Sequence, residues 1–470
     1  MKVGFVSLGC PKNLVDSEVM MGQLTARGHE LTTHPDQADV LVVNTCSFID
    51  PAKQESIDTI LEMAEYKRIG RAKRLVVAGC LVERYRGDIK QDLPEVDAII
   101  GTNEIDQIVA VCEGIETPAA EDPGLYLYHD LTPRVLATPR HFAYMKIAEG
   151  CDHPCTFCVI PQYRGKFRSR RFESVISEAT RLFSQGVREI NLIGQDTTCY
   201  GEDFGLKDGL AVLLARLAQI ETPQEKWVRF LYAYPNRVTQ KLLDTIAKHA
   251  ALVKYIDMPL QHASASVLKR MKRGANGDIF LNLIERIRRT IPGVAIRTSF
   301  IAGFPGETDE DFETLCQFVK AAEFDRMGVF SYSDEDTSGS YELDGKVDAL
   351  TIANRKRKLM AIQRRVSRAR NKRLVGSDVQ VLVEGPSADT DLLWQARMST
   401  QAPEIDGVVL INDVEGGDPQ PGQMRMLRIT ETHDYDIIGT LLPSFEDDLR
   451  IMAAPATLIS IAPALHIPAR

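Results

Sequence analysis

The sequence contains no apolar run that approaches the roughly 18 residues of a membrane-spanning helix. Its N-terminus has no cationic leader and no small-residue cleavage site, so residues 1–10 are expected to form a strand and not a signal peptide. Nine cysteines, an odd number in a chain of 470 residues, favour metal ligation or catalysis over a disulfide framework. The sequence therefore predicts a cytoplasmic protein that does not enter a membrane.

Charge is separated along the chain, although the net charge is only −9. Residues 355–373 contain ten basic side chains and no acidic one, whereas residues 377–440 contain twelve acidic and three basic ones. Such blocks can form solvated surfaces, or they can attract partners of opposite charge. We expect a basic protein to suit the acidic block, and phosphate or RNA to suit the basic one.

The first 120 residues repeat one pattern three times: an apolar strand that ends near a cysteine and is followed by a helical stretch. The strands cover residues 3–8, 40–43 and 75–78, and the cysteines are Cys10, Cys46 and Cys80. Near-continuous apolar strands that alternate with amphipathic helices are typical of a doubly wound parallel sheet. Because sites in such sheets form at the carboxyl ends of the strands, the three cysteines are expected to converge at one edge.

A second series of strands and helices is expected over residues 142–374. Before it, residues 121–141 carry three prolines without a clear period, which predicts a linker that crosses the surface. Six strand–helix units suit a partial (β/α)6 barrel, smaller than the eightfold form. The strands are expected at residues 143–148, 189–193, 227–232, 253–258, 295–301 and 327–332. The loops at their carboxyl ends form the predicted working face.

The last part of the chain changes from helix to short strands. Residues 353–374 are expected to form one basic helix with an apolar stripe at Leu359, Ile362 and Val366. Residues 377–441 predict a small antiparallel β-barrel of the OB type. Its expected strands lie at residues 379–383, 407–411, 424–429 and 437–438. The tail at 444–470 is expected to be disordered. The predicted fold class is α/β, with three domains.

The densest group of potential ligands is residues 149–161, EGCDHPCTFCVIP. Cys151, Cys155 and Cys158 follow a predicted strand, and two prolines force the segment into a loop. Three thiolates on one loop can hold three irons of a [4Fe-4S] cluster and leave the fourth iron open. A zinc site would need a further ligand pair, and His153 could supply one ligand only by straining the loop. The cysteines without motif context, expected to be small buried side chains, are Cys112, Cys199 and Cys316.

This loop resembles that of the radical S-adenosylmethionine (SAM) superfamily, in which an aromatic residue usually stands where Phe157 does. The resemblance implies that the open iron binds SAM and that reduction cleaves SAM to a 5′-deoxyadenosyl radical. Such a radical is needed where no side-chain base could ionise the carbon–hydrogen bond.

Four further segments narrow the resemblance to the methylthiotransferases, over about residues 1–440. They are residues 7–18 (SLGCPKNLVDSE), 44–46 (NTC), 78–80 (AGC) and 300–308 (FIAGFPGET). The family implies a second [4Fe-4S] cluster, held by Cys10, Cys46 and Cys80 and also left with an open iron. One SAM would methylate sulfur on this cluster, and a second would give the radical that removes hydrogen from the substrate carbon. Proximity of the clusters would let the carbon radical meet its sulfur donor.

Three loops at predicted strand ends match places where the superfamily contacts SAM. The residues concerned are Gly194, Gln195, Pro259, Gln261, Gly303, Phe304 and Gly306. Turn formation is the alternative for each. It is strongest for residues 303–307, because Thr308 with Asp311 has the pattern of a helix N-cap and its acidic partner.

Five more polar side chains have two interpretations each. Lys146 and Arg297, on predicted strands, would face the SAM carboxylate or serve as cations at the edge of the core. Tyr163, Arg164 and Arg168 follow the cysteine loop and would grip the substrate or be solvated.

The methylthiotransferase family divides by substrate, between an aspartate of ribosomal protein uS12 and an adenosine of transfer RNA. The last barrel resembles a TRAM domain, a module usually credited with RNA binding, but nucleic-acid contact needs a basic face. An acidic barrel instead suits a basic ribosomal protein. Residues 9–18 also resemble the ribosomal-protein (RimO-type) subgroup.

The sequence thus predicts a transferase that inserts a methylthio group at the β-carbon of an aspartate of uS12, free or on the small subunit. It would use SAM, two [4Fe-4S] clusters and a reductant such as flavodoxin, and its basic helix would contact ribosomal RNA. One alternative is a tRNA-adenosine (MiaB-type) methylthiotransferase, which shares every catalytic part. The other is a non-catalytic two-cluster carrier, which would need neither a barrel nor open irons.

Overall fold

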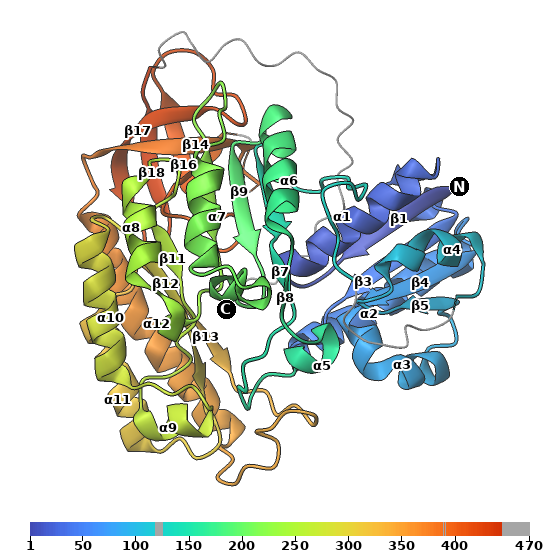
Figure 1. Ribbon diagram of the computed structural model, residues 1–470, viewed down its shortest axis with the longest axis horizontal. Coiled ribbons are helices and arrows are strands. Elements are labelled where there is room, and N and C mark those ends of the chain that lie inside the picture. Colours follow the sequence, from blue (N-terminus) through green and yellow to red (C-terminus); the bar gives the residue numbers. More distant parts are fainter. Residues whose placement is uncertain (118–125, 389, 391, 444–470) are drawn as a thin grey trace.

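The computed structural model describes residues 1–117, 126–388, 390 and 392–443, which form three parts in contact with one another (Figure 1). A sheet domain lies beside a central open barrel, and a small closed barrel packs on one end of the central one. The tail predicted for residues 444–470 lies outside the described residues. Within those residues, no helix is long and apolar enough to cross a membrane.

The N-terminal domain is a five-stranded parallel sheet in the order β2-β1-β3-β4-β5, with helices on both faces. Its elements are β1 (Lys2–Ser7), α1 (Pro11–Ala26), β2 (Glu30–Thr32), η1 (Pro35–Gln37), β3 (Val40–Thr45), α2 (Asp50–Ile69), β4 (Arg74–Gly79), α3 (Cys80–Asp92), β5 (Ala98–Ile100), η2 (Ile105–Gln107) and α4 (Ile108–Glu113). Alternate side chains of a strand point to opposite faces. Val40 and Val42 therefore pack in one core with α1 and α4, whereas Leu41 and Val43 pack in another with α2 and α3. The predicted doubly wound sheet is confirmed.

The central barrel has six parallel strands in two sheets of three, β10-β9-β6 and β11-β12-β13. The first half comprises β6 (Phe142–Lys146), β7 (Ala148–Glu149), α5 (Ile160–Arg164), β8 (Arg168–Ser169), α6 (Phe172–Ser184), β9 (Glu189–Ile193), η3 (Thr197–Cys199), η4 (Glu202–Phe204), α7 (Gly209–Ala218) and β10 (Trp227–Phe230). The second comprises η5 (Pro235–Arg237), α8 (Gln240–Lys248), β11 (Tyr255–Asp257), α9 (Ala265–Arg270), α10 (Gly277–Thr290), β12 (Ala295–Ala302), α11 (Asp309–Ala322) and β13 (Arg326–Ser331). An isolated bridge between Val228 and Leu252 links the halves. The predicted six-unit partial barrel is confirmed.

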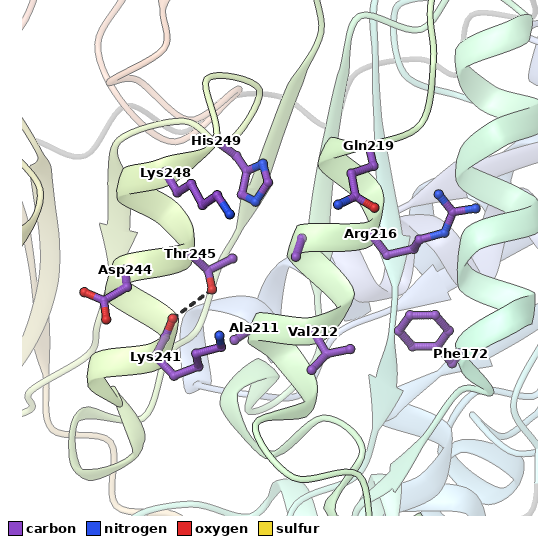
Figure 2. Close-up of a pocket in the computed structure, with 11 residues that line it drawn as sticks. Phe172, Ala211, Val212, Arg216, Gln219, Lys241, Asp244, Thr245, Lys248 and His249 are labelled. Atoms are coloured by element: carbon purple, nitrogen blue, oxygen red, sulfur yellow. Dashed lines mark hydrogen bonds between the residues drawn. The ribbon is translucent and has the colours of Figure 1, made fainter.

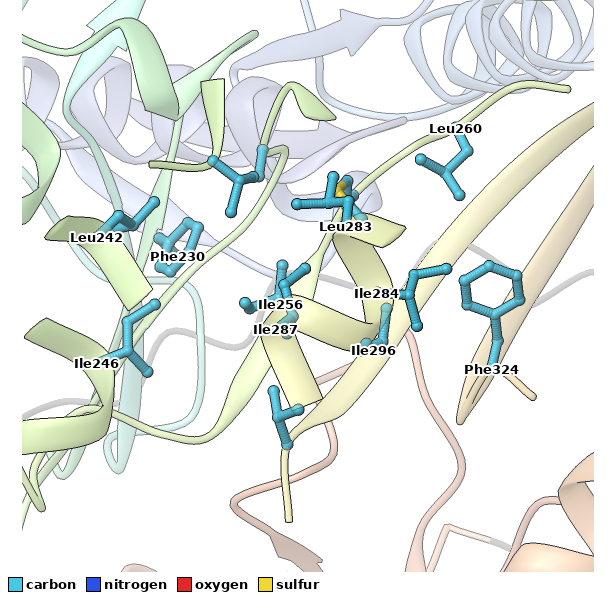
Figure 3. Packing of buried hydrophobic residues seen from close by; sticks show 14 of the residues in the cluster. Phe230, Leu242, Ile246, Ile256, Leu260, Leu283, Ile284, Ile287, Ile296 and Phe324 are labelled. Atoms are coloured by element: carbon cyan, nitrogen blue, oxygen red, sulfur yellow. The ribbon is translucent and has the colours of Figure 1, made fainter. Parts of the chain in front are cut away.

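Apolar side chains fill the space between the barrel strands and the outer helices (Figure 3). On α10, Leu283, Ile284 and Ile287 recur at helical spacing and pack in one cluster with Ile256 and Ile296 of the strands. A helix with such an apolar stripe must bury it, so each helix lies back along the outside of the sheet. This core fixes the strand ends and therefore the loops that carry the site.

The described half of the predicted linker runs along the surface with some side chains packed inward: Leu131 is 80% exposed, whereas Tyr128 and Thr138 are buried. Residues 126–141 pass α1, and Arg134 pairs with Glu18 of that helix at 2.5 Å, with both side chains at most 3% exposed. A Cβ on Gly22 would collide with the backbone of Pro133, so α1 needs a glycine there. The prolines predicted irregular backbone correctly, but a composition signal cannot say what the segment packs against.

Helix α12 (Ala349–Lys372) leads to the closed barrel, whose strand order is β14-β15-β16-β18-β17. The strands are β14 (Asp378–Pro386), β15 (Trp394–Met398), β16 (Val409–Val414), β17 (Met424–Thr432) and β18 (Ile437–Leu441). All pairings are antiparallel except β16 with β18, which is parallel. Strand β15 was not among the predicted strands, although Trp394, Ala396 and Met398 alternate with polar residues as in a half-buried strand. Arg397 is nevertheless buried.

The closed barrel docks at the amino ends of the central strands, whereas the cysteine loop lies at their carboxyl ends (Figure 1). Arg397 donates to Glu189, the first residue of β9, at 2.7 Å and to Glu384 at 2.6 Å. The loop over residues 399–406 approaches Arg229, whose guanidinium donates to two of its carbonyls at 3.0 Å. The small barrel therefore closes one end of the central barrel and leaves the other end open for chemistry.

Candidate functional site

Cys10, Cys46 and Cys80 converge at the carboxyl edge of the N-terminal sheet, as the strand pattern predicted. They follow β1, β3 and β4, and a Cβ on Gly9 would lie 3.0 Å from Cys46 Sγ. The strand order reverses between β1 and β3, which is where a doubly wound sheet opens a crevice. Burial raises the pKa of Cys46 to about 12, and the nearby Cys10 and Cys80 add to that effect. We call these three residues the sheet cysteines.

Cys151, Cys155 and Cys158 form a second group, the loop cysteines, between β7 and α5. Gly150 turns the chain into this loop with φ +76°, and a Cβ on it would collide with the Lys166 carbonyl. The Cys158 amide donates to the Cys155 carbonyl at 3.2 Å, which forms a tight turn. Burial raises the pKa of Cys158 to about 12.

Neither cysteine group has the close ligand spacing of a site for a single ion. Among the residues that the structure describes, neither group has all three sulfurs within 4.8 Å of one another. Zinc–sulfur bonds of about 2.3 Å would hold the sulfurs of one ion about 3.8 Å apart. A [4Fe-4S] cluster is larger and takes each thiolate on a different iron. Three thiolates in each group match the ligands of a cluster with one iron free of protein ligands, and the assignment of the six cysteines to two such clusters stays a prediction.

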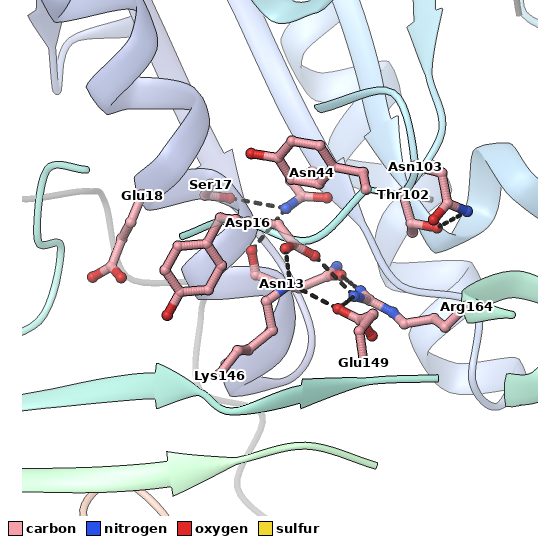
Figure 4. A network of polar contacts seen from close by, with 12 residues as sticks. Asn13, Asp16, Ser17, Glu18, Asn44, Thr102, Asn103, Lys146, Glu149 and Arg164 are labelled. Atoms are coloured by element: carbon pink, nitrogen blue, oxygen red, sulfur yellow. Dashed lines mark hydrogen bonds and ion pairs between the residues drawn. The ribbon is translucent and has the colours of Figure 1, made fainter. Parts of the chain in front are cut away.

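A buried network of charges joins the two cysteine groups across the domain boundary (Figure 4). Arg164 of α5 donates to Cys80 Sγ at 3.4 Å and pairs with Asp16 of α1 at 2.9 Å. Lys146 of β6 pairs with the same Asp16 and, at 2.8 Å, with Glu149. Burial alone would raise the pKa of Glu149, but Lys146 and Arg164 outweigh it and lower that pKa. Every charge in the network has a partner, so the network fixes one group relative to the other.

One short segment after β10 passes both cysteine groups. Tyr232 lies near Cys10, and Lys12 Nζ lies 3.5 Å from the centroid of its ring. Tyr234 lies near Cys155 on the other side. Two residues of chain span at most about 7 Å. Both groups are therefore within side-chain reach of the same segment, and Tyr232 has a φ of +64°, a conformation that clusters at functional sites.

His153 ties the cysteine loop to the loop after β9. Its Nε2 lies 2.6 Å from Asp196 Oδ2, and its ring stacks on Tyr234 with centroids 3.8 Å apart. Asp196 also accepts from the Thr198 amide at 2.8 Å and from Cys199 Sγ at 2.9 Å. His153, Asp196 and Cys199 are close enough to share a metal ion, but their hydrogen bonds to one another already satisfy them. We interpret the group as a clamp on the loop.

The predicted SAM contacts after β9 and β11 lie on the face that carries the loop cysteines. Gln195 Nε2 donates to Glu149 at 2.6 Å, and among the described residues its buried Oε1 has no partner. A buried acceptor without a partner is one that a ligand would satisfy. Gln261 has a φ of +72°, and the Pro259 carbonyl accepts from Arg273 at 2.6 Å. Contact of these residues with SAM stays a prediction.

Residues 303–307 have the turn-forming role that the sequence offered as an alternative. Thr308 and Asp311 form a capping box at the start of α11, as predicted. Gly303 and Gly306 have φ near +82°, and a Cβ on either would be crowded by side chains of α12 or α9. Phe304 is fully buried in the barrel core. Packing and capping therefore explain the residues at positions 303–307 without a ligand. Contact of these residues with SAM stays a prediction.

Other predicted contacts are less specific. Phe157 packs against the barrel core, and a Cβ on Gly194 would meet only ordinary contacts. Arg297 pairs with Asp257 at 2.7 Å, so its charge is already neutralised, as is that of Lys146 in the network.

Two of the three polar residues after the cysteine loop are buried, and the third is partly exposed. Tyr163 and Arg164 are buried, and Arg168 donates to the Tyr126 carbonyl at 3.1 Å. The three cysteines without motif context are buried as predicted: Cys112, Cys199 and Cys316.

The groove shown in Figure 2 lies on the outer helical surface and is not part of this site. Its lining residues belong to α6, α7 and α8 or directly follow α7 or α8, and none belongs to a loop at the carboxyl end of a strand.

Sequence reasoning missed Lys12, Tyr234 and Arg273. Lys12 stands two residues after Cys10, so a cation beside a cysteine was the available signal. Arg273 Nη1 lies 3.6 Å from Cys155 Sγ, and its guanidinium lies 4.2 Å from the Tyr234 ring centroid. No local pattern in the sequence predicts that contact, because the barrel brings the residues together.

Family models match three separate parts of the chain. Residues 2–101 match the uncharacterized protein family UPF0004, residues 145–319 the radical SAM superfamily, and residues 375–442 the TRAM domain. A ribosomal protein uS12 methylthiotransferase RimO from Solibacter usitatus is 79% identical and covers 97% of this chain and 98% of its own. The RimO protein of Koribacter versatilis is 57% identical over 94% of this chain and 96% of its own.

Solved structures match at low sequence identity and bear on the fold alone. The radical SAM methyltransferase TsrM from Kitasatospora setae, solved with cobalamin and a [4Fe-4S] cluster, has a TM-score of 0.53 at 14% identity. The match covers 70% of this chain and 72% of TsrM. The match shows that the two chains share a fold over that part of their length.

Proposed function

We propose a function from the premise that the chain belongs to the ribosomal protein uS12 methylthiotransferase (RimO) family. In this proposal the transferase replaces a hydrogen on the β-carbon of an aspartate of uS12 with a methylthio group. One SAM gives its methyl group to a sulfur carried by the auxiliary cluster and leaves as S-adenosylhomocysteine. A second SAM takes one electron, and its adenosyl part accepts the hydrogen atom, so methionine and 5′-deoxyadenosine leave. The electron returns to the protein when the carbon–sulfur bond forms.

One observation carries the proposal: two groups of three thiols stand within reach of one segment, and buried charges lock them together. A single cluster would suffice for SAM cleavage, and an electron carrier would need no open barrel. A substrate radical, however, must meet its sulfur donor before it is quenched, which requires both groups at one place.

Each cysteine group has a role in this scheme. The loop cysteines would hold the cluster that cleaves SAM, with Gln195 and Arg273 as polar groups on the same face. The sheet cysteines would hold the auxiliary cluster, with Arg164 donating to Cys80. When bound, these clusters and SAM supply the radical and the methylthio sulfur. The protein contributes position and the exclusion of water.

The acidic face offered to uS12 is smaller than the sequence suggests. Glu384 and Asp406 bond to other side chains at the boundary with the central barrel. Asp413, Glu415 and Asp418, at the end of β16 and just beyond, are exposed. This patch belongs to the closed barrel, which docks away from the cysteine loop, so in our proposal it holds the body of the basic protein and not the target side chain.

The proposal includes ribosomal RNA as a partner of α12, because much of its charge is free. Four basic residues of the helix pair with carboxylates: Arg355, Lys358, Arg368 and Arg370. Five exposed basic residues at or after residue 357 have no ion-pair partner among the described residues: Arg357, Arg364, Arg365, Lys372 and Arg373. Such a row suits phosphates. The proposal also includes a cytoplasmic location, where the small subunit is found, and a reductant such as flavodoxin, because the cleavage of SAM takes one electron.

The test is an anaerobic reaction of the iron–sulfur-loaded protein with SAM, a reductant and either purified uS12 or transfer RNA. We expect 5′-deoxyadenosine to form and the intact mass of uS12 to rise by one methylthio group for hydrogen. Tandem mass spectrometry should place that group on an aspartate. Modification of transfer RNA alone would refute the choice of substrate, and absence of 5′-deoxyadenosine would refute the reaction class.

A further inference from the structure

Lys12 is a buried cation without a carboxylate. Its side chain is 9% exposed, and among the described residues no hydrogen-bond or ion-pair partner reaches its ammonium group. Its contact is with the face of the Tyr232 ring, 3.5 Å from the centroid. A ring face offsets only part of the cost of removing an ammonium group from water. No carboxylate of the described residues pairs with this ammonium group, although Cys10 and Glu149 lie near enough to interact with its charge, so the position can take a carboxylate from outside the chain.

Three neighbouring cations differ from Lys12 because each already pairs with a carboxylate. Lys146 and Arg164 share Asp16 and Glu149, and Arg297 pairs with Asp257. The unpaired charge of Lys12 is thus not a general property of this region.

Arg273 is a second buried cation that has no carboxylate partner among the described residues. It lies beside the loop cysteines, with Nη1 at 3.6 Å from Cys155 Sγ, whereas Lys12 lies beside Cys10 of the sheet cysteines. The proposed reaction brings in two carboxylates, one on SAM and one on the substrate aspartate. Arg273, beside the loop cysteines, suits the carboxylate of SAM. Lys12, beside the sheet cysteines, suits the carboxylate of the substrate aspartate.

The chemistry of the reaction explains why a cation at the Lys12 position would help to place the substrate. In an aspartate, the reacting β-carbon is bonded directly to the carboxylate carbon. A cation that holds the carboxylate therefore also positions the reacting carbon, which lies one bond of about 1.5 Å from the carboxylate carbon. Lys12 stands over Tyr232, in the segment that passes both cysteine groups. An adenine base carries no anion, so in a transfer RNA the anions nearest to the reacting carbon would be backbone phosphates, which are not bonded to it as the carboxylate of an aspartate is.

We propose that Lys12 binds the carboxylate of the substrate aspartate and selects that side chain for reaction. The inference rests on the proposed function and adds to it the residue that recognises the substrate class. Charge-assisted recognition of this kind is strong because both partners leave water together and each would be costly to bury alone.

The test compares uS12 with a version whose target aspartate is replaced by asparagine. We expect the wild-type iron–sulfur-loaded enzyme to bind natural uS12 at least about thirtyfold more tightly than the asparagine form. Lys12→Met should bind both forms equally, whereas Lys12→Arg, which keeps the charge, should retain the preference. Calorimetry measures the affinities without turnover, and iron and sulfide analysis checks both clusters.

The control is Lys226→Met, which makes the same change at another buried lysine. Lys226 is 8% exposed and donates to the Ile220 carbonyl beside β10, so its loss should leave the preference intact. A preference that survives in Lys12→Met would overturn the inference. So would a Lys12→Met enzyme that loses affinity for SAM while it still prefers the aspartate form, because Lys12 would then belong to SAM. Failure of the wild type to modify uS12 would instead refute the proposed function.

Discussion

At the scale of single residues, three of the six motif cysteines follow a glycine in a left-handed conformation. Gly9, Gly79 and Gly150 have φ of +87°, +96° and +76° and directly precede their cysteines. A strand that ends in such a turn redirects the next side chain toward the strand's carboxyl end. Most residues adopt positive φ at a cost of about 1–2 kcal/mol, whereas glycine does so freely.

Gly150→Ala should therefore disrupt the cysteine loop. The added Cβ meets the backbone of Lys166, which cannot move without moving β8, so the collision adds to the conformational cost. We expect loss of the loop cluster, measured as iron per chain, and a lower melting temperature. Gly186→Ala is the control, because its φ is +95° but nothing lies within 4 Å of the new Cβ. It should cost about 1 kcal/mol and retain both clusters. Equal iron loss in both variants would contradict the explanation.

Cys155→Ala should separate the two clusters. The variant loses a ligand of the loop cluster but leaves Cys10, Cys46 and Cys80 intact, so we expect one cluster's iron to remain and SAM cleavage to cease. Iron analysis and detection of 5′-deoxyadenosine measure both effects. Cys316→Ala removes a buried thiol without motif context and should keep both clusters. Continued SAM cleavage by Cys155→Ala would refute the assignment.

At the scale of elements, α12 has two faces with different roles, and the residues of the two faces alternate along its sequence. Its inner face carries Leu359, which is fully buried in the barrel core, and Arg355, which pairs with Glu307 at 3.2 Å. Its outer face carries the free basic row. The helix runs from the carboxyl-end loop at Gly303, which contacts Ile352, to the closed barrel. A partner on this row would touch the outside of the molecule along the whole central barrel.

Reversing charge on that row should weaken binding to the ribosomal small subunit. We expect Arg364→Glu with Arg365→Glu to lower affinity at low salt and to reduce the salt slope by about two, because two phosphate contacts are lost. Arg289→Glu makes the same kind of change on the exposed surface of α10 and should have little effect. Titration at several salt concentrations provides the measurement. An unchanged slope in the double variant would remove α12 from the interface.

At the scale of the whole molecule, buried ion pairs join the closed barrel to the central barrel. Glu189 accepts from both Arg229 at 2.9 Å and Arg397 at 2.7 Å, and the side chains of all three are at most 1% exposed. Removing one member of such a buried set leaves an uncompensated charge, at a cost of about 3–5 kcal/mol. Arg397→Met should therefore destabilise the chain by about that amount in chemical denaturation. Arg428→Met breaks the exposed pair with Asp378 and should cost less than about 1 kcal/mol.

The same interface makes stability depend on pH. Burial alone would raise the pKa of Glu384, but Arg397 and His141 outweigh it and lower the pKa from 4.5 to about 2. A carboxyl group whose pKa is lower in the folded state stabilises the fold above its unfolded value, and that contribution is lost as pH falls. We expect the free energy of unfolding to drop between pH 4.5 and about 2. In Glu384→Gln the drop should be smaller over that range.

The sequence by itself determined the elements, the six cysteines and the family. Strand–glycine–cysteine patterns and amphipathic helices are local, so β1, β9 and α12 could be predicted within a few residues, and parallel topology then placed Cys10, Cys46 and Cys80 at one edge. Only the tertiary structure decided which charges remain free. Lys146, Arg164 and Lys12 look alike in the sequence, but the first two meet Asp16 across the domain boundary and Lys12 meets a ring. Partners distant in sequence come together only through packing of whole domains, and that packing leaves one ammonium group for the substrate.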